Sequence, residues 1–278
     1  STLANNKGVG SYSSNGNITV TGNSTIKNNT TGNSALTFSG GTFNFTNSGA
    51  FRLGGTNNTS VNIFANNIVA GTGTRTLSIG GDTGDVAVWR LAGNNTFTGA
   101  ITVARGTLEF QSLSNLGTAT SLTLSSGGGT NFRHIGLEDT VINRTITYAA
   151  AGSSSTTTIT NNGLGTLSLT GATITASNNN VGKTLTLTGF NTGDNRISSN
   201  ILAGADGTSS ATSLSKTGAG TWILSGANTI GAGANGAAGN VVIGNGRLVP
   251  DYETNDVLAL ASNVALAGGT LEIRGKSG

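Results

Sequence analysis

Apolar residues alternate with small polar residues along most of the chain. Segments 36–38, 77–79, 101–103, 122–124 and 185–187 each carry two Leu, Ile, Val or Phe residues separated by one Ser or Thr. A period of two places the apolar side chains on one face of a β-strand and the polar ones on the other. The pattern therefore predicts many short strands, each with one buried face.

The same alternation is present in "SVNIFA" and "DVAVWR". It predicts that Val61 and Ile63, and likewise Val86 and Val88, point into the core. Gly-Gly, Gly-Asn, Asn-Gly and Asn-Asn pairs separate the strands at short and fairly regular intervals, as turns do. No segment of ten or more residues shows a clean helical period, so we expect almost no helix.

An internal repeat indicates how these strands are arranged. "WRLAGNNTF", beginning at Trp89, matches "WILSGANTI", beginning at Trp222, and "VARGTL" after the first copy matches "IGNGRL" after the second. The second spacing is seven residues longer than the first, and the extra residues fall in "GAGANGAAGN". A solenoid tolerates such an insertion, because a loop on its rim leaves the stacked strands undisturbed.

We therefore predict an all-β fold, a narrow parallel β-helix formed as one continuous segment over residues 1–278. The repeat-like units lie near residues 86–132 and 212–273. Each rung would hold about 20–25 residues and pair with the next rung at about 4.8 Å. A β-sandwich or a β-barrel is the alternative fold.

The repeat also selects candidate structural residues. Asparagines at turns can stack in amide ladders along a solenoid, and we expect this of Asn95, Asn162, Asn179 and Asn228, with Asn95 and Asn228 at equivalent turns. The predicted core positions are Trp89, Leu91, Leu108, Trp222, Leu224 and Leu248.

Residues 214–248 resemble the passenger-associated transport repeat of autotransporter passenger domains and related bacterial surface proteins. That pattern runs K-x-G-x-G-x-L-x-L-x-G-x-N, followed later by G-x-L, and Trp222 takes the place of its first Leu. The earlier copy lacks the Lys and Gly-x-Gly at the start. The resemblance implies a right-handed parallel β-helix on a bacterial surface and no particular activity. The matching positions are Lys216, Gly218, Gly220, Leu224, Gly226, Asn228, Gly246 and Leu248.

Composition excludes several classes of function. The net charge of +3 comes from 14 basic and 11 acidic residues without a basic cluster, whereas nucleic-acid binding needs Lys and Arg gathered in a patch. The chain has no cysteine, hence no disulfide. Its apolar runs are far shorter than the ~20 residues of a membrane helix. We expect no nucleic-acid partner and no membrane insertion of this segment.

Catalytic chemistry has few candidates. The single histidine, His134, is expected in a surface loop with Arg133 or Arg144 paired to a nearby acid, since a hydrolase needs an orienting acid and an exposed nucleophile beside it. The densest acidic group is Asp251, Glu253 and Asp256. Its spacing fits no known calcium loop, so a charged rim loop is favoured over a cation site. We expect no metal, no cofactor and no enzymatic activity.

The predicted function is a non-enzymatic extracellular segment, structural or adhesive, of a larger bacterial surface or autotransporter-type protein. Its partners would be flanking segments or further copies of the same protein, stacked head to tail into filaments through exposed strand edges, and glycans. One alternative is a polysaccharide-active β-helix enzyme. Another is a glycan-binding or ice-binding module that uses the threonine-rich strands near residues 156–160 and 184–188.

Overall fold

The protein is described by a computed structural model that divides into two compact units. Unit 1 comprises Ser1–Thr123 and Gly127–Arg133, and unit 2 comprises Leu124–Ser126 and His134–Gly278. The residues that the structure describes are 2–6, 10–45, 48–69, 75–125, 129–148, 155–177, 182–203, 212–230, 239–255, 257 and 263–276.

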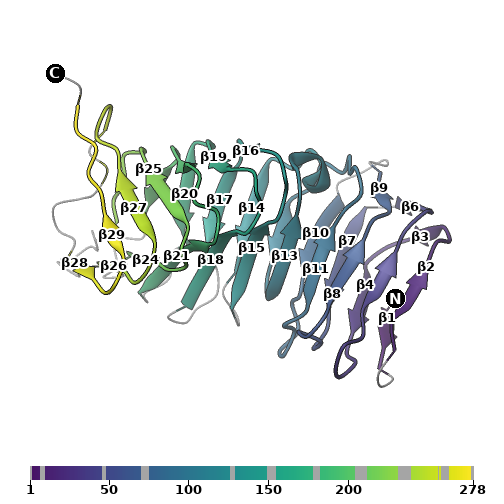
Figure 1. Ribbon diagram of the computed structural model, residues 1–278. Helices are drawn as coiled ribbons and strands as arrows, with labels where there is room; N and C mark the ends of the chain where they lie inside the picture. The colour runs from purple at the N-terminus through teal and green to yellow at the C-terminus, as the bar shows by residue number, and fades with distance from the viewer. Residues whose placement is uncertain are drawn as a thin grey trace. The chain divides into compact units, whose positions relative to one another are not determined.

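The strands of unit 1 belong to three sheets that the chain visits in turn (Figure 1). Strands within a sheet pair in parallel, so each circuit of the sheets adds one rung of a β-solenoid. The first sheet contains β1 (Thr2–Asn5), β4 (Ser24–Asn28), β7 (Gly49–Gly54), β10 (Arg75–Ile79), β12 (Ile101–Val103) and β14 (Ser121–Leu124). The second contains β2 (Tyr12–Ser14), β5 (Leu36–Phe38), β8 (Val61–Phe64), β11 (Val88–Leu91), β13 (Gly106–Phe110) and β15 (Thr130–His134). The third contains β3 (Ile18–Val20), β6 (Thr42–Phe45) and β9 (Asn67–Ile68).

Unit 2 is built in the same way, again with parallel pairing. One group of neighbouring strands is β17 (Thr145–Tyr148), β20 (Thr173–Ala176) and β23 (Asn200–Leu202). A second group is β18 (Ser155–Asn161), β21 (Lys183–Gly189), β24 (Thr212–Lys216), β26 (Asn240–Ile243) and β28 (Asn263–Leu266). A third is β16 (Thr140–Ile142), β19 (Leu167–Leu169), β22 (Asn195–Ile197), β25 (Thr221–Leu224), β27 (Arg247–Pro250) and β29 (Thr270–Leu271).

The predicted all-β parallel β-helix is confirmed. A sandwich would pack two antiparallel sheets, whereas successive strands here return to the same sheet in parallel. Helix in the described residues is limited to one 3₁₀ turn, η1 (Leu113–Leu116). Among those residues, no helix is both long and apolar enough to span a bilayer.

Rung length varies more than predicted. Val88 of β11 pairs with Thr107 of β13, whereas Lys183 of β21 pairs with Thr212 of β24, so the second rung is half as long again as the first. The strands stay in register in both cases, because the turns between them absorb the difference. The alternation of apolar and polar residues within strands carries no information on the length of the turns. The predicted rung length of about 20–25 residues therefore lies between these two observed rung lengths and includes neither.

The core is a column of inward side chains in each unit. Aromatic rings pack against one another in unit 1, where the Phe110 and Phe132 rings stack with centroids 4.5 Å apart. The six candidate core residues, Trp89, Leu91, Leu108, Trp222, Leu224 and Leu248, are all fully buried.

Two strands present the opposite face from the one predicted. In β8, Asn62 and Phe64 are fully buried, and Val61 and Ile63 lie on the outer face. In β11, Trp89 faces inward, which turns Val88 outward because successive side chains alternate. The apolar pattern in "SVNIFA" was misleading because the inward position of β8 is occupied by a hydrogen-bonded amide. Val86, which precedes β11, is exposed as well.

Candidate functional site

The tryptophans of the two sequence repeats make equivalent hydrogen bonds, each within its own unit. Trp89 Nε1 donates to the carbonyl of Gly54 at 3.0 Å, and Trp222 Nε1 donates to the carbonyl of Thr188 at 3.1 Å. Both indoles are fully buried and both reach a strand end of an earlier rung. A buried indole N–H needs such an acceptor, so these residues join rungs and do not form part of an exposed site.

The repeat asparagines also have matching partners. Asn95 Oδ1 accepts the N–H of Ile68 at 2.7 Å, and Asn228 Oδ1 accepts the N–H of Ile201 at 2.7 Å. Each side-chain nitrogen donates to a backbone carbonyl of the following rung. Both asparagines lie between strands and are buried. One amide thus links the preceding and the following rung.

Sequence reasoning missed a second set of buried amides. Asn28 Nδ2 donates to Asn62 Oδ1 at 2.7 Å in unit 1, and Asn161 Nδ2 donates to Asn195 Oδ1 in unit 2. In both units the accepting oxygen also receives a backbone N–H from the first residue of a strand. The same two-residue ladder is therefore built twice in the chain. Of the four predicted ladder positions, Asn162 is exposed and Asn179 lies outside the described residues.

A third amide closes the turn beside each ladder. Asn57 Nδ2 lies 2.9–3.3 Å from carbonyls of residues 30–34, and Asn191 Nδ2 lies 2.9–3.1 Å from carbonyls of residues 163–165. With the ladders, the tryptophans and the repeat asparagines, this gives four matched features, and the offset along the chain between the two copies is nearly the same for each. The two units therefore repeat one buried framework, well beyond the segments in which the sequence repeat is obvious.

Lys216 supports the corner of one rung in unit 2. Its ammonium donates to the carbonyls of Thr217, Gly218 and Asn245 at 2.7, 2.8 and 3.0 Å. An ammonium has three N–H groups, so each has an acceptor and the side chain joins two rungs. Burial of this residue lowers the pKa of its ammonium to about 8. The lysine of the repeat pattern is thus a structural cation.

This depressed pKa predicts a rise in stability with pH. The ammonium of Lys216 loses its proton near pH 8 in the folded chain and near pH 10.5 in the unfolded chain. Between these values the unfolded chain binds more protons, so the free energy of unfolding increases with pH. We expect Lys216→Met to lose about 1–2 kcal/mol of this increase between pH 8 and pH 10. Urea unfolding of both proteins at several pH values measures it, and parallel pH profiles would contradict the assignment.

His134 does not lie in a surface loop, contrary to the sequence-based expectation. It is fully buried, with Nδ1 2.9 Å from Asn161 Oδ1 and Nε2 3.1 Å from Thr140 Oγ1. The oxygen of Asn161 can only accept, so Nδ1 is the donor. Arg133 instead forms an ion pair with Glu109 at 2.9 Å. A buried ring held at both nitrogens has no access to a substrate.

The buried carboxylates each have a structural partner. Asp85 accepts the backbone N–H groups of Gly55 and Asp82 at 2.9 and 3.0 Å, and Glu109 pairs with Arg90 at 2.9 Å. The described residues contain no group of three or more His, Asp or Glu arranged to hold a metal.

The acidic segment that includes Asp251, Glu253 and Asp256 gives no cation site in the described part of the chain. Asp251 pairs with Arg196 at 3.1 Å and accepts the backbone N–H of Glu253. Asp256 lies outside the described residues. A carboxylate already paired with a guanidinium is a poor cation ligand, so Asp251 helps to attach this segment to β22.

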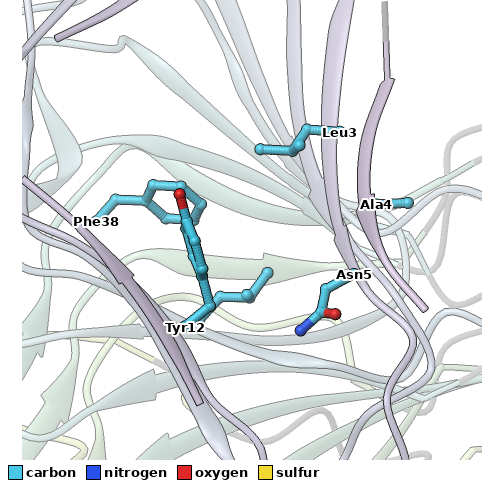
Figure 2. Close-up of a pocket in the computed structure, with 6 residues that line it drawn as sticks. Leu3, Ala4, Asn5, Tyr12 and Phe38 are labelled. Carbon is cyan, nitrogen blue, oxygen red and sulfur yellow. The ribbon is translucent and has the colours of Figure 1, made fainter. Parts of the chain in front are cut away.

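An open pocket of about 250 Å³ lies at β1 and β2 and is lined mainly by apolar side chains (Figure 2). Leu3 and Tyr12 are more than half exposed there, although they stand in register with the core residues Ile26 and Leu36. Each of these two strands has one neighbour in its sheet. The cavity is thus an open section of solenoid core, shaped to receive apolar side chains. It is lined by Leu3, Ala4, Asn5, Tyr12, Leu36 and Phe38.

The threonine-rich strands of unit 2 form two outer columns. Thr156, Thr184 and Ser213 are in register across β18, β21 and β24, and the residues two positions later repeat the pattern. Thr156 is exposed and the other members are half-buried. The outer face of these strands therefore carries a regular array of hydroxyl groups.

Comparison with known proteins agrees with this architecture. The passenger-associated-transport-repeat family matches residues 87–110 and 214–249. The chain is 34% identical over 148 residues to the adhesin BmaC autotransporter of Brucella suis biovar 1 (strain 1330). This alignment covers 50% of this chain and 4% of that protein. No solved structure matches the chain. Two segments of this parallel β-solenoid are therefore similar to the passenger-associated-transport-repeat family.

Proposed function

We propose that the chain is a non-enzymatic adhesive segment of an autotransporter-type protein, displayed outside the bacterial cell. The observation that carries the proposal is the pair of transport repeats in a chain that is similar to an adhesin autotransporter. The buried amides and tryptophans of both repeats, and Lys216 of the second repeat, hold rungs together. This leaves the outer surface free to vary and to bind.

The ionisable groups support a non-enzymatic role. A general acid needs a raised pKa, whereas hydrogen bonding and charge from Lys27 and Arg52 lower the pKa of Asp82. The neighbouring Arg274 and Arg247 likewise lower the pKa of Glu272. Both groups are thus carboxylates in ion pairs, and the histidine is sequestered. A polysaccharide-active enzyme would instead require free carboxylates facing one groove.

The strand edges support assembly as part of the same proposal. The open core at Leu3 and Tyr12 and the exposed apolar residues Val264 and Leu266 of β28 are in register with buried core columns. A further parallel rung added at each of these two edges would cover the exposed apolar residues there. Such a rung could come from a flanking segment or from a second copy stacked head to tail. Sedimentation velocity over a range of concentrations and electron microscopy test for filaments of the purified chain.

We expect the purified, fluorescently labelled chain to bind cultured mammalian cells saturably. Flow cytometry at increasing protein concentration measures this binding. A chain of equal size from a solenoid without adhesin relatives is the control for non-specific attachment. Attachment no greater than that of the control would contradict an adhesive role.

Glycan binding is a second candidate for the adhesive target, favoured by the hydroxyl columns on β18, β21 and β24. A glycan array and an ice-recrystallisation assay test this face. Replacement of the half-buried Thr158 and Thr186 by valine keeps the shape of each side chain and removes its hydroxyl. If this face binds glycans, the double valine variant binds them more weakly than the unchanged chain. Equal binding by the two proteins would contradict glycan recognition by this face.

A further inference from the structure

The three most exposed large apolar side chains that the structure describes lie in successive turns of unit 2. Leu164 is 81% exposed, Phe190 71% and Leu137 70%. They occupy the turns 135–139, 162–166 and 190–194, which belong to three successive rungs. We call these three residues the apolar corner.

Backbone hydrogen bonds bring these turns into contact. The N–H of Leu164 donates to the carbonyl of Gly136 at 2.8 Å, which stacks Leu164 over Leu137. The N–H of Phe190 donates to the carbonyl of Asn161 of the preceding rung at 3.1 Å, which places Phe190 over Asn162, two residues before Leu164. Since rungs are about 4.8 Å apart, the apolar corner forms a patch of roughly 10 Å along the rungs of unit 2.

The fold does not need apolar residues at this corner. Leu164 follows Asn161 by three positions, as Thr31 follows Asn28 in the matching ladder of unit 1. Phe190 directly precedes the turn-closing Asn191, as Thr56 precedes Asn57. Thr31 and Thr56 are exposed, and unit 1 still builds the same framework around them. Leu164 and Phe190 therefore contribute apolar surface that the framework does not require.

The charge around the apolar corner is negative. Its three turns contain Glu138, Asp139 and Asp194 and no lysine or arginine, although the whole chain has a net charge of +3. The backbone N–H of Thr166 donates to Asp139 at 2.6 Å and is the main cause of the lowered pKa of that carboxyl. Asp194 forms an ion pair with Arg274 at 3.9 Å, so the net negative charge of the three turns comes from Glu138 and Asp139. An apolar patch surrounded by carboxylates complements a partner that is apolar and basic.

We propose that the apolar corner is a docking surface for a polypeptide segment whose apolar side chains are flanked by lysine or arginine. This partner class deepens the adhesive function proposed above and rests on it. Pairing of two identical corners would bring like charges together, and an anionic membrane would repel the carboxylates, so both are disfavoured occupants. Exposed apolar surface of this kind marks interaction sites on soluble proteins.

The test uses variants that copy unit 1. Leu164→Thr with Phe190→Thr places at the corner the residue type that unit 1 carries at the matching positions, so the framework is preserved. Glu138→Gln removes one exposed charge. Leu113→Thr, at a half-exposed leucine of η1 in unit 1, is the matched control. Circular dichroism and urea unfolding check that all the proteins are folded.

The probe is a labelled 18-residue peptide of leucine and lysine arranged as an amphipathic helix, and fluorescence anisotropy measures its binding to the full chain. We expect the double variant to bind at least about tenfold more weakly and Glu138→Gln about two- to fivefold more weakly. Leu113→Thr should bind like the unchanged chain. A peptide with glutamate in place of lysine should not bind.

Equal binding of the lysine peptide by the unchanged chain and the double variant would overturn the proposal. Two other results would also overturn it. If the unchanged chain bound phosphatidylcholine vesicles and the double variant did not, the occupant would be a lipid surface. If the unchanged chain self-associated and the double variant did not, the occupant would be a second copy. Cell attachment separates the two proposals. If the double variant attaches to cells as well as the unchanged chain does, the apolar corner is not the docking surface and the adhesive function stands. If neither protein attaches, the adhesive function itself is wrong.

Discussion

Gly189→Ala is expected to lower the free energy of unfolding of unit 2 by more than about 4 kcal/mol. Gly189 has a φ of +120°, and a Cβ atom there would lie 2.0 Å from the carbonyl oxygen of Asn161. That oxygen belongs to the backbone of the adjacent rung, so it cannot move away as the end of a side chain could. The clash adds to the cost of a positive φ for an alanine, which is on the order of 1 kcal/mol or more.

The structure supplies a control that separates these two costs. Gly84 also has a positive φ, of +92°, but a Cβ atom there would meet nothing within 4 Å. We expect Gly84→Ala to cost only about 1–2 kcal/mol, the backbone contribution alone. Urea unfolding, combined with hydrogen exchange at β18 and β21, measures both variants. Equal losses in the two would show that close packing of rungs is not what requires glycine.

Asn195→Ala is expected to destabilise unit 2 by about 3–5 kcal/mol, the second-largest effect. The side-chain oxygen of Asn195 accepts from Asn161 Nδ2 and from the N–H of Leu167 at 3.0 Å. Its side-chain nitrogen donates to the carbonyl of Thr221 at 2.8 Å. Each buried group left without a partner costs about 1–3 kcal/mol, and alanine would leave several of them.

Asn162→Ala provides the comparison, since Asn162 directly follows Asn161, the partner of Asn195, and is exposed. We expect its unfolding free energy to stay within about 0.5 kcal/mol of the unchanged chain, as for most surface substitutions. Chemical unfolding and limited proteolysis measure the pair. If both substitutions cost the same, the buried ladder does not stabilise the solenoid.

The buried framework could be predicted only in part. Matching "WRLAGNNTF" with "WILSGANTI" identified Trp89 and Trp222, and the structure buries both indoles against an earlier rung. Asn62 was missed because it sits between Val61 and Ile63, where alternation assigns the inward face to valine and isoleucine. The signal that could have found it is the offset between the two tryptophans, because the same offset relates Asn28 and Asn62 to Asn161 and Asn195.

The apolar corner had no signal in the sequence. Leu137, Leu164 and Phe190 each follow a glycine and precede a polar residue or another glycine. A single apolar residue in such a turn is as compatible with a core contact as with exposure. Only the pairing of rungs brings three turns that are distant in the sequence next to one another. His134 shows the converse, because a polar residue with acidic neighbours in sequence is fully buried.

Strand type, the turns and the solenoid repeat follow from the sequence, because alternation, glycine-rich turns and a repeated tryptophan unit are local properties of the chain. Register, rung length and the composition of each outer face depend on the tertiary structure. A parallel strand finds its partner one full rung further along the chain, so its neighbours are set by how long each turn is. The inward face of β8, the hydrogen bond from Lys216 to the carbonyl of Asn245 and the apolar corner all result from that long-range pairing.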